Sequence, residues 1–321
     1  MVDTLPFYQI LPLVPVLNLL VGGNLDADIK ALSDTLIGEI FFALGFSKTG
    51  FAARTFGWPF RKATDRLSTI GVTADHMIAS DGFPAAAAWM MSHWVRRVTV
   101  RGADTIPSGG PLLVIANHCG AYDFLVIPSQ LCRTDIKIIS SDIPFLKNLP
   151  NASDHLFFLT DATSDRMMAA RGALRYLHSG GSLLLFGTGR IDPDPAVYSN
   201  AEKSIDEWSP SIELFLRQAP ETRVVVAICS GIVSSRWAHH PLTYLRRIDW
   251  QKRRLAEFGQ VLQQLFVPAK YYVSPCVSFA PPVSVDELHR ESGSDRVLPA
   301  VISRGKDLLA DHAAWIRTIP T

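Results

Sequence analysis

The sequence predicts an α/β protein, with a mixed and mostly parallel sheet flanked by helices and with a helical N-terminal extension. Three observations predict this class. From Val98 onward, short apolar stretches typical of buried strands alternate with longer stretches of helical period. Between residues 26 and 95 the period is helical and no strand is indicated. The 321 residues are 48% apolar and 19% charged, which allows a sizeable core.

The N-terminal extension starts with an apolar stretch at residues 5–22. Three prolines interrupt it (Pro6, Pro12 and Pro15), so a continuous helix is not expected. We expect the stretch to pack on the protein or to dip into a bilayer interface, and a full membrane span is the alternative. It lacks a basic start, so no secretory signal is expected.

Helices are expected over residues 26–45 and 83–97. Between residues 51 and 66, aromatic side chains stand beside arginines and a lysine. This mixture suits a membrane interface, or equally a helix that packs on the core with a solvated basic face. The pattern changes near Arg96, so the sequence predicts a helical, membrane-associating region at residues 1–95 and an α/β domain at 96–321.

Within the α/β domain, the apolar runs predict strands separated by helices. Strands are expected at residues 98–102, 111–117, 135–140, 155–160, 182–187 and 223–231, with one or two more in 270–283. Helices are expected at residues 123–131, 165–180 and 297–316.

Charge and cysteine content exclude several classes. The net charge of +1 argues against nucleic acid as the main partner, because phosphate binding needs a basic excess. The cysteines, at positions 119, 132, 229 and 276, show no Cys-x-x-Cys spacing, so neither a zinc site nor a redox pair is indicated. Four cysteines in a chain of this length fit a reducing compartment. The Gly-x-Ser-x-Gly and P-loop motifs are absent, which argues against a serine hydrolase and a P-loop enzyme.

A histidine and an aspartate interrupt the apolar run at residues 114–128. On a regular helix, His118 and Asp123 would point roughly 140° apart. They can meet only if His118 lies in the turn after the strand and Asp123 in the following helix. In that arrangement the histidine can accept a proton from a hydroxyl, and the aspartate can fix its tautomer. A buried histidine bonded to an aspartate for structural reasons is the alternative.

The stretch "GADTIPSGGPLLVIANHCGAYDFLVI" resembles the first block of the glycerolipid acyltransferase family, the 1-acylglycerol-3-phosphate acyltransferase-like superfamily. In that family an apolar strand runs into Asn-His-x4-Asp, and Asn117, His118 and Asp123 match it. The resemblance extends over about residues 96–285, with looser later blocks. It implies that His118 and Asp123 are catalytic and that Asn117 lies at the substrate.

The third block of the family is usually a strand followed by Phe-Pro-Glu-Gly-Thr-Arg. Here Phe186 and Gly189 match, whereas Gly187 and Thr188 replace the proline and the glutamate. Arg190 stands one position before the usual arginine. A cation in a glycine-containing turn after a strand can hold a phosphate, so we expect all five residues to bind substrate. The alternative is an ordinary turn with an exposed arginine.

The second block departs further from the family pattern. Thr160 or Asp161 falls where the family has an arginine that contacts the acceptor's phosphate. Arg166 or Arg171 from the next helix could replace it. The fourth block has its strand at residues 223–231 but lacks the usual proline. These departures weaken the case for a phosphorylated acceptor.

The resemblance implies acyl transfer from an acyl thioester, either acyl-CoA or acyl-carrier protein. The acceptor would be a hydroxyl of a lipid-like molecule, for example a lysophospholipid or glycerol phosphate. No acyl-enzyme, metal or other cofactor is required. A non-catalytic lipid-binding protein on the same fold is the alternative, motivated by the altered second and third blocks. Because both His118 and Asp123 are present, catalysis is favoured.

Residues 236–254 carry six lysines and arginines against one aspartate, interleaved with Trp237, Tyr244 and Trp250. This pattern suits anionic lipid headgroups or an acidic carrier protein, although a solvated helix face would show it too. With the apolar N-terminal stretch, it predicts a peripheral or monotopic protein at the cytoplasmic face of a membrane.

Overall fold

The computed structural model describes residues 25–43, 57–160 and 162–320. They belong to two compact units, residues 1–73 and 74–321. The apolar stretch at residues 5–22, part of the aromatic and basic stretch (residues 51–56) and Asp161 lie outside the described residues. Within the described part of the chain, no helix is both long enough and apolar enough to cross a bilayer.

The first unit contains helix α2 (Leu25–Ala43) and the first turns of α4 (Trp58–Asp81). The two helices are joined by a buried hydrogen bond of 2.7 Å between the hydroxyls of Ser33 and Thr64. The rings of Phe41 and Phe60 pack edge to face, with their centroids 6.1 Å apart. The predicted helical character of this part of the chain is confirmed.

The second unit is built on one eight-stranded sheet, whose strands the described residues define as follows. They are β1 (Thr99–Arg101), β2 (Leu112–Ala116), β3 (Ile136–Ser141), β4 (Leu156–Leu159), β5 (Ser182–Phe186), β6 (Arg223–Ser230), β7 (Cys276–Phe279) and β8 (Val283–Ser284). The order is β1-β7-β6-β2-β5-β3-β4, and β8 pairs with β6. Strand β6 runs antiparallel to β7 and β8, and the other pairs are parallel. The predicted mixed, mostly parallel sheet is confirmed.

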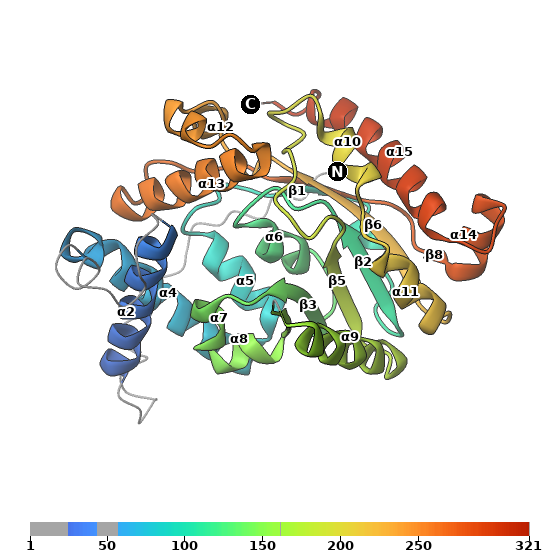
Figure 1. The fold of residues 1–321 in the computed structure, drawn as a ribbon, viewed down its shortest axis with the longest axis horizontal. Coiled ribbons are helices and arrows are strands. Elements are labelled where there is room, and N and C mark those ends of the chain that lie inside the picture. Colours follow the sequence, from blue (N-terminus) through green and yellow to red (C-terminus); the bar gives the residue numbers. More distant parts are fainter. Residues whose placement is uncertain (1–24, 44–56, 161, 321) are drawn as a thin grey trace. The chain divides into compact units, whose positions relative to one another are not determined.

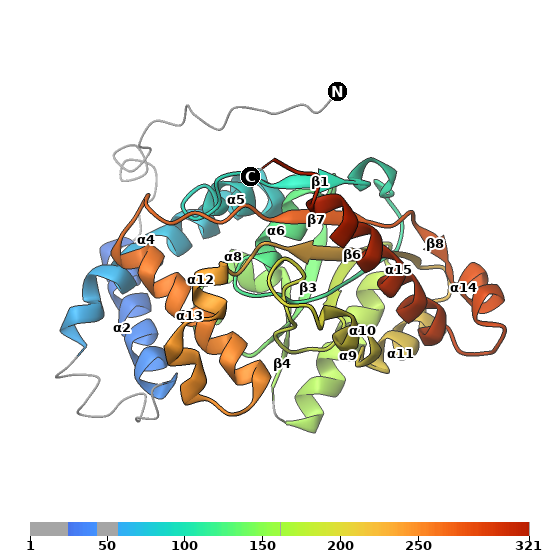
Figure 2. The same cartoon turned by 90° about the horizontal axis from the view of Figure 1, so that it is seen from above.

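Helices cover both faces of this sheet (Figures 1 and 2). The longer ones are α5 (Phe83–Met91), α6 (Asp123–Ser129), α9 (Thr163–His178), α11 (Ser211–Gln218), α13 (Asp249–Phe266), α14 (Val285–Ser292) and α15 (Leu298–Ile316). Short ones are η1 (Ala103–Thr105), α7 (Pro144–Lys147), α8 (Pro150–Asp154), α10 (Ala201–Asp206), α12 (Ser235–Ala238) and η2 (Pro241–Leu245). Every residue of β2 is buried, as expected for a central strand covered on both faces.

The main core lies between the sheet and α9, α11, α14 and α15. Leu113 and Ile115 of β2 point into it beside Leu183 and Leu185 of β5. The alternate residues of β2 face the other side, where α5 and α6 pack. This double cover explains why the two strands read as continuous apolar runs in the sequence.

The residues between the first unit and the strands belong structurally to the α/β unit. Asp75, near the end of α4, accepts hydrogen bonds from the side chain of Asn151 and the amide of Ala152. Trp94, just after α5, stacks on Tyr122 with ring centroids 5.6 Å apart. Compactness therefore divides the chain at residue 73, whereas the change of sequence pattern lies near Arg96. The functional division at residue 95 stays a prediction.

A buried histidine ties α15 to two neighbouring strands. The ring nitrogens of His312 lie 2.7 Å from the hydroxyls of Ser230 on β6 and Ser278 on β7. Burial, assisted by the charge of Arg101, lowers the pKa of His312 to about 4. The neutral ring therefore belongs to the folded state at neutral pH.

We predict that His312→Leu lowers the free energy of unfolding by about 1–3 kcal/mol at pH 7, because the Ser230 hydroxyl loses its buried partner. Between pH 6.5 and about 4, the unfolded wild-type chain binds a proton at this residue that the folded chain does not. The stabilisation by His312 is therefore complete above pH 6.5 and declines as the pH falls. Urea unfolding at pH 7 and pH 5 should show the difference between wild type and variant shrinking at pH 5. A constant or growing difference would contradict this assignment.

Candidate active site

The candidate site lies where neighbouring parallel strands end together. In the register of the sheet, Ala116 at the end of β2 pairs with Phe186 at the end of β5 and with Ala227 on β6. The turns that follow β2 and β5 therefore leave the sheet at the same carboxyl edge. In parallel α/β sheets, this edge is where ligands bind.

His118 and Asp123 meet at this edge, as the turn-and-helix geometry requires. His118 Nδ1 lies 2.9 Å and 3.0 Å from the two carboxylate oxygens of Asp123, the first residue of α6. Asp123 is fully buried, and one of its oxygens also accepts the amide of Gly120 at 3.0 Å. Because Nδ1 faces a carboxylate, it carries the proton in the neutral ring, and Nε2 is the basic nitrogen.

The ring of Phe186 covers one side of the imidazole. The two ring centroids are 4.4 Å apart and the planes are inclined by 27°. The His118 side chain keeps 24% of its surface exposed. In the described part of the chain, Nε2 has no hydrogen-bond partner. This nitrogen is therefore available to a substrate.

Acidic groups raise the pKa of His118. Burial acts to lower it, but the charge and hydrogen bond of Asp123, with smaller effects of Glu257 and Asp192, raise it to about 9. At neutral pH the imidazole is mostly protonated in the free protein. Its neutral form, which can accept a proton, becomes more populated as the pH rises.

Asn117 makes its contacts inside the protein. Its side-chain amide donates to the Cys229 carbonyl at 2.9 Å and accepts the Cys229 amide at 2.8 Å. It also lies 3.0 Å from the Cys119 sulfur. These bonds extend the pairing of β2 and β6 beyond Ala116. The contacts of Asn117 thus fix the turn that carries His118, whereas substrate contact was expected from the sequence.

The glycines after β5 serve close packing of the turn. The Gly187 amide donates to the Ala116 carbonyl at 2.8 Å, and the Gly189 amide donates to the Phe186 carbonyl at 3.1 Å. A Cβ at residue 187 would lie 2.5 Å from the indole of Trp208, so only glycine fits there. Gly189 has φ of +64°, a conformation that favours glycine. Both amides are engaged, so neither is free to stabilise a developing oxyanion.

Thr188 and Arg190 point to different partners. The Thr188 hydroxyl donates to Asp192 at 2.8 Å. The guanidinium of Arg190 pairs with Glu207, and both side chains are about half exposed. The expected substrate contact of Arg190 would therefore compete with this ion pair.

Two aspartates that the sequence did not single out hold the site loops. Asp192 accepts the backbone amide of His118 at 2.9 Å, and its own amide donates to the His118 carbonyl. Asp194 is buried and accepts amides after β6, those of Gly231, Ile232 and Val233. The signal was visible as Asp-Pro-Asp-Pro directly after the third block. That motif, however, does not predict which residues the two aspartates bind, because their partners lie 37 to 74 residues away in the sequence.

Helix α13 supplies a further carboxyl group to the site. A Cβ on Gly120 would lie 3.5 Å from Cγ of Glu257, so this side chain covers the turn between His118 and Asp123. Burial raises the pKa of Glu257 to about 7; the charge of His118 acts against this rise and that of Asp123 contributes to it. One helical turn earlier, Arg253 donates Nε to the Ile191 carbonyl at 3.0 Å. Helix α13 thus contacts both loops of the site.

The two residues expected to replace the second-block arginine lie on α9, Arg166 in its first turn and Arg171 near its middle. The Thr160 hydroxyl donates to Asp165 at 2.8 Å, and Arg166 Nε donates to the Thr160 carbonyl at 2.8 Å. Arg171 is exposed on the same helix. None of these contacts involves His118 or the turn at residues 187–190.

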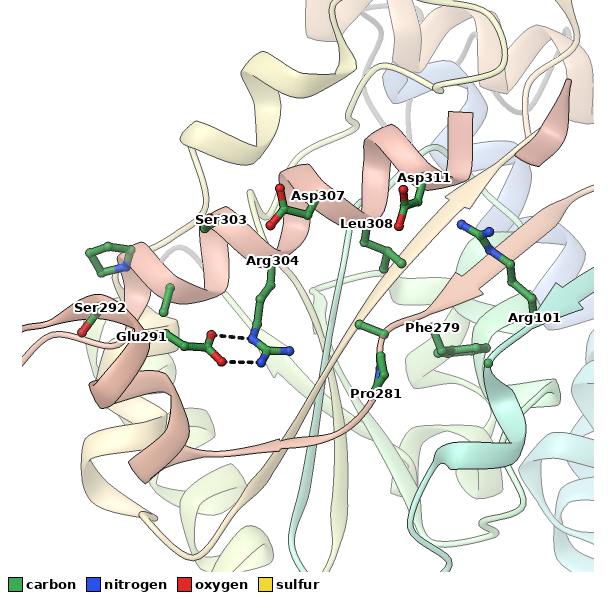
Figure 3. A pocket seen from close by; sticks show the side chains of 14 residues that line it. Arg101, Phe279, Pro281, Glu291, Ser292, Ser303, Arg304, Asp307, Leu308 and Asp311 are labelled. Atoms are coloured by element: carbon green, nitrogen blue, oxygen red, sulfur yellow. Dashed lines mark hydrogen bonds and ion pairs between the residues drawn. The ribbon is translucent and has the colours of Figure 1, made fainter. Parts of the chain in front are cut away.

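A separate hollow of about 750 Å³ lies between α14, α15 and the end of β7 (Figure 3). Its lining is charged: Arg304 pairs with Glu291, and Asp307 and Asp311 stand on the same helix as Arg304. No residue predicted for catalysis or substrate binding lines it. The candidate active site is the His118 edge of the sheet.

Comparisons with known proteins identify the family of the chain. A family model described as Acyltransferase matches residues 97–277, more than half of the chain. No curated protein matches. Among solved structures, the chain is similar to the 1-acyl-sn-glycerophosphate (LPA) acyltransferase PlsC from Thermotoga maritima. That match is 14% identical, covers 96% of this chain and 99% of the other, and has a TM-score of 0.45. The family match shows that the chain belongs to the acyltransferase family and is an acyltransferase, which confirms the resemblance seen in the sequence.

Proposed function

We propose that this acyltransferase moves a fatty acyl group from an acyl thioester to a hydroxyl of a lipid-like acceptor, with His118 as the general base. The contact of His118 Nδ1 with Asp123, which leaves Nε2 open at the sheet edge, is the observation that carries the proposal. A base that is oriented by a buried carboxylate needs no nucleophile of the protein's own when the acceptor brings a hydroxyl.

In the proposed step the acyl group passes directly from the thioester to the acceptor oxygen, without an acyl-enzyme. Nε2 of neutral His118 takes the proton of the acceptor hydroxyl while its oxygen attacks the thioester carbonyl. The carbon–sulfur bond breaks, and the imidazolium returns the proton to the departing thiolate. Asp123 keeps Nδ1 protonated and stabilises the cation that forms midway. The donor is acyl-CoA or acyl-carrier protein, and no further cofactor takes part.

Charges near the base favour an acceptor whose reacting end is neutral. Asp123, Asp192 and Glu257 all act on His118, and an acceptor phosphate placed among them would be repelled. A lysophospholipid with a headgroup has a phosphodiester with a single negative charge, whereas the phosphomonoester of glycerol phosphate carries almost two, so we propose the lysophospholipid before glycerol phosphate. Arg190 is the cation we assign to a phosphate of acceptor or donor, once it leaves Glu207.

We further propose that the enzyme works as a peripheral or monotopic protein at the cytoplasmic face of a membrane. A lipid acceptor resides in a bilayer, and the basic and aromatic residues at 236–254 suit an anionic surface. An acidic carrier protein as donor would meet the same cations.

His118→Ala should lower acceptor-dependent thiol release from palmitoyl-CoA by about 10²–10⁴-fold, the usual contribution of a general base. The assay uses a panel of lysophospholipids and glycerol 3-phosphate, and is repeated with palmitoyl-carrier protein. His178→Ala is the matched control, because His178 also pairs with a carboxylate, but at the opposite edge of the sheet. Normal turnover by a well-folded His118→Ala protein would refute the mechanism.

The pH dependence of kcat/KM should show an acidic limb controlled by His118. Activity should rise with pH from 6.5 towards about 9, because only the neutral imidazole is a base. Glu257→Gln removes a negative charge that helps to raise this pKa, so the limb should shift to lower pH. A Glu257→Gln limb that coincides with wild type would exclude an electrostatic role of Glu257.

Arg190→Ala should raise KM for acceptor or donor by about tenfold, with a smaller effect on kcat, because a charged hydrogen bond to substrate is lost. Glu207→Gln should lower the same KM, because it releases Arg190 from its ion pair. Unchanged KM values for both substrates in both variants would remove Arg190 from the substrate site.

A further inference from the structure

The segment between α12 and α13 exposes apolar side chains next to exposed arginines. Within residues 241–248, here called the apolar turn, Leu242 is 49% exposed, Tyr244 69%, Leu245 75% and Ile248 51%. Arg246 and Arg247 between them are exposed as well. Among the described residues neither arginine has an acidic partner, since the nearby ion pair joins Lys252 to Asp249. Large apolar side chains gathered in this way mark an interaction surface.

Contacts with α12 and α13 fix the conformation of the apolar turn. Thr243 is buried, and its hydroxyl donates to the His240 carbonyl at 2.7 Å. Trp237 stacks on His240 and donates its indole N–H to Gln263 of α13 at 2.7 Å. A Cβ on Gly259 would lie 2.2 Å from the Trp237 ring, so α12 sits directly on the α13 backbone. The exposed side chains therefore belong to a fixed protrusion of the fold.

Helix α13 connects the apolar turn to the active site. Asp249, Arg253 and Glu257 follow at intervals of four residues and share one face of the helix. Arg253 bonds the carbonyl of Ile191, and Glu257 covers Gly120 beside His118. From Ile248 to Arg253 the helix rises only about 8 Å. Whatever binds the apolar turn therefore lies close to the mouth of the site.

We propose that the apolar turn inserts into the interface of a bilayer that carries anionic headgroups, and so presents the His118 site to lipid acceptors. The inference rests on the proposed function for its biological purpose. Leucine, isoleucine and tyrosine side chains suit the acyl boundary, and the flanking arginines suit anionic headgroups. An acidic carrier protein could pair with the arginines, but this pairing does not account for the four exposed apolar side chains.

An environment-sensitive fluorophore on the apolar turn of the full-length chain tests this directly. The label is placed at Leu245→Cys in a Cys132→Ser/Cys276→Ser background, because Cys132 is exposed and Cys276 partly so. Vesicles of phosphatidylcholine, with and without about one-third phosphatidylglycerol, are added. The matched control is a label at Met168→Cys, an exposed apolar position on α9, which is well separated from α13 in Figure 1.

We expect the label at residue 245 to shift to the blue and to become protected from iodide with the anionic vesicles, while the label at 168 is unchanged. Arg246→Gln and Arg247→Gln should each weaken this partitioning by about fivefold. Raising the salt from about 0.1 M to about 1 M should weaken it too. No spectral change at residue 245 with either vesicle overturns the proposal, and a change only with acyl-carrier protein replaces the bilayer by a protein partner.

The labelled protein is also assayed for thiol release with a water-soluble, short-chain acceptor and donor. Insertion of the label without acceptor-dependent turnover would contradict the proposed function and leave the docking surface intact. Turnover on soluble substrates without insertion would leave the function intact and refute the docking surface.

Discussion

The contact between the Asp123 carboxylate and His118 Nδ1 is the interaction on which the account of this acyltransferase depends. It exists because β2 ends at Ala116 and the chain turns sharply before α6 begins at Asp123. A helix through these residues would separate the two side chains. The parallel register brings Phe186 to the same edge, where its ring covers the imidazole. The sheet thereby positions His118 so that Asp123 binds its Nδ1, while its Nε2 stays open to a substrate.

Carboxylates elsewhere in the site bind backbone amides and so hold the loops at this edge. Asp192 exchanges hydrogen bonds with the backbone of His118, and Asp194 gathers the amides that follow β6. The loop after β5 is therefore fastened to the loops after β2 and β6. The same acidic residues affect the chemistry, because Asp192 adds to the charges that raise the pKa of His118. The same carboxylate therefore helps both to position His118 and to raise its pKa.

Much of the fold was predictable because its signals are local. The strands β2 and β5 are short apolar runs bounded by glycine-containing turns, and α9 and α15 have clear helical period. The meeting of His118 and Asp123 could also be predicted, since only one local geometry brings them together. The helices at 201–218 and 249–266 were not predicted, because α13 mixes its buried positions with charged residues that serve the site and the surface.

The parts of the site that sequence reasoning missed depend on contacts distant in sequence. Glu257 reaches Gly120 across 137 positions of chain only after α13 has packed, and no motif marks it. The bonds of Asn117 to Cys229, by which it fixes the turn, were not foreseen, and its contact with substrate stays a prediction. Gly187 stands where the family has proline because the indole of Trp208 leaves no room for a Cβ at this position. The role of a residue was thus predictable only where residues near it in the sequence determine that role.

Nitrogen-15 NMR of the histidine side chains tests the central claim most directly. The full-length protein is labelled at histidine, and the His118 signals are assigned by their loss in His118→Asn. We predict that this ring titrates well above pH 6.5 and that its neutral form carries the proton on Nδ1. Titration below 6.5, or a neutral ring with the proton on Nε2, would contradict the contact with Asp123 as the interaction that orients and tunes His118.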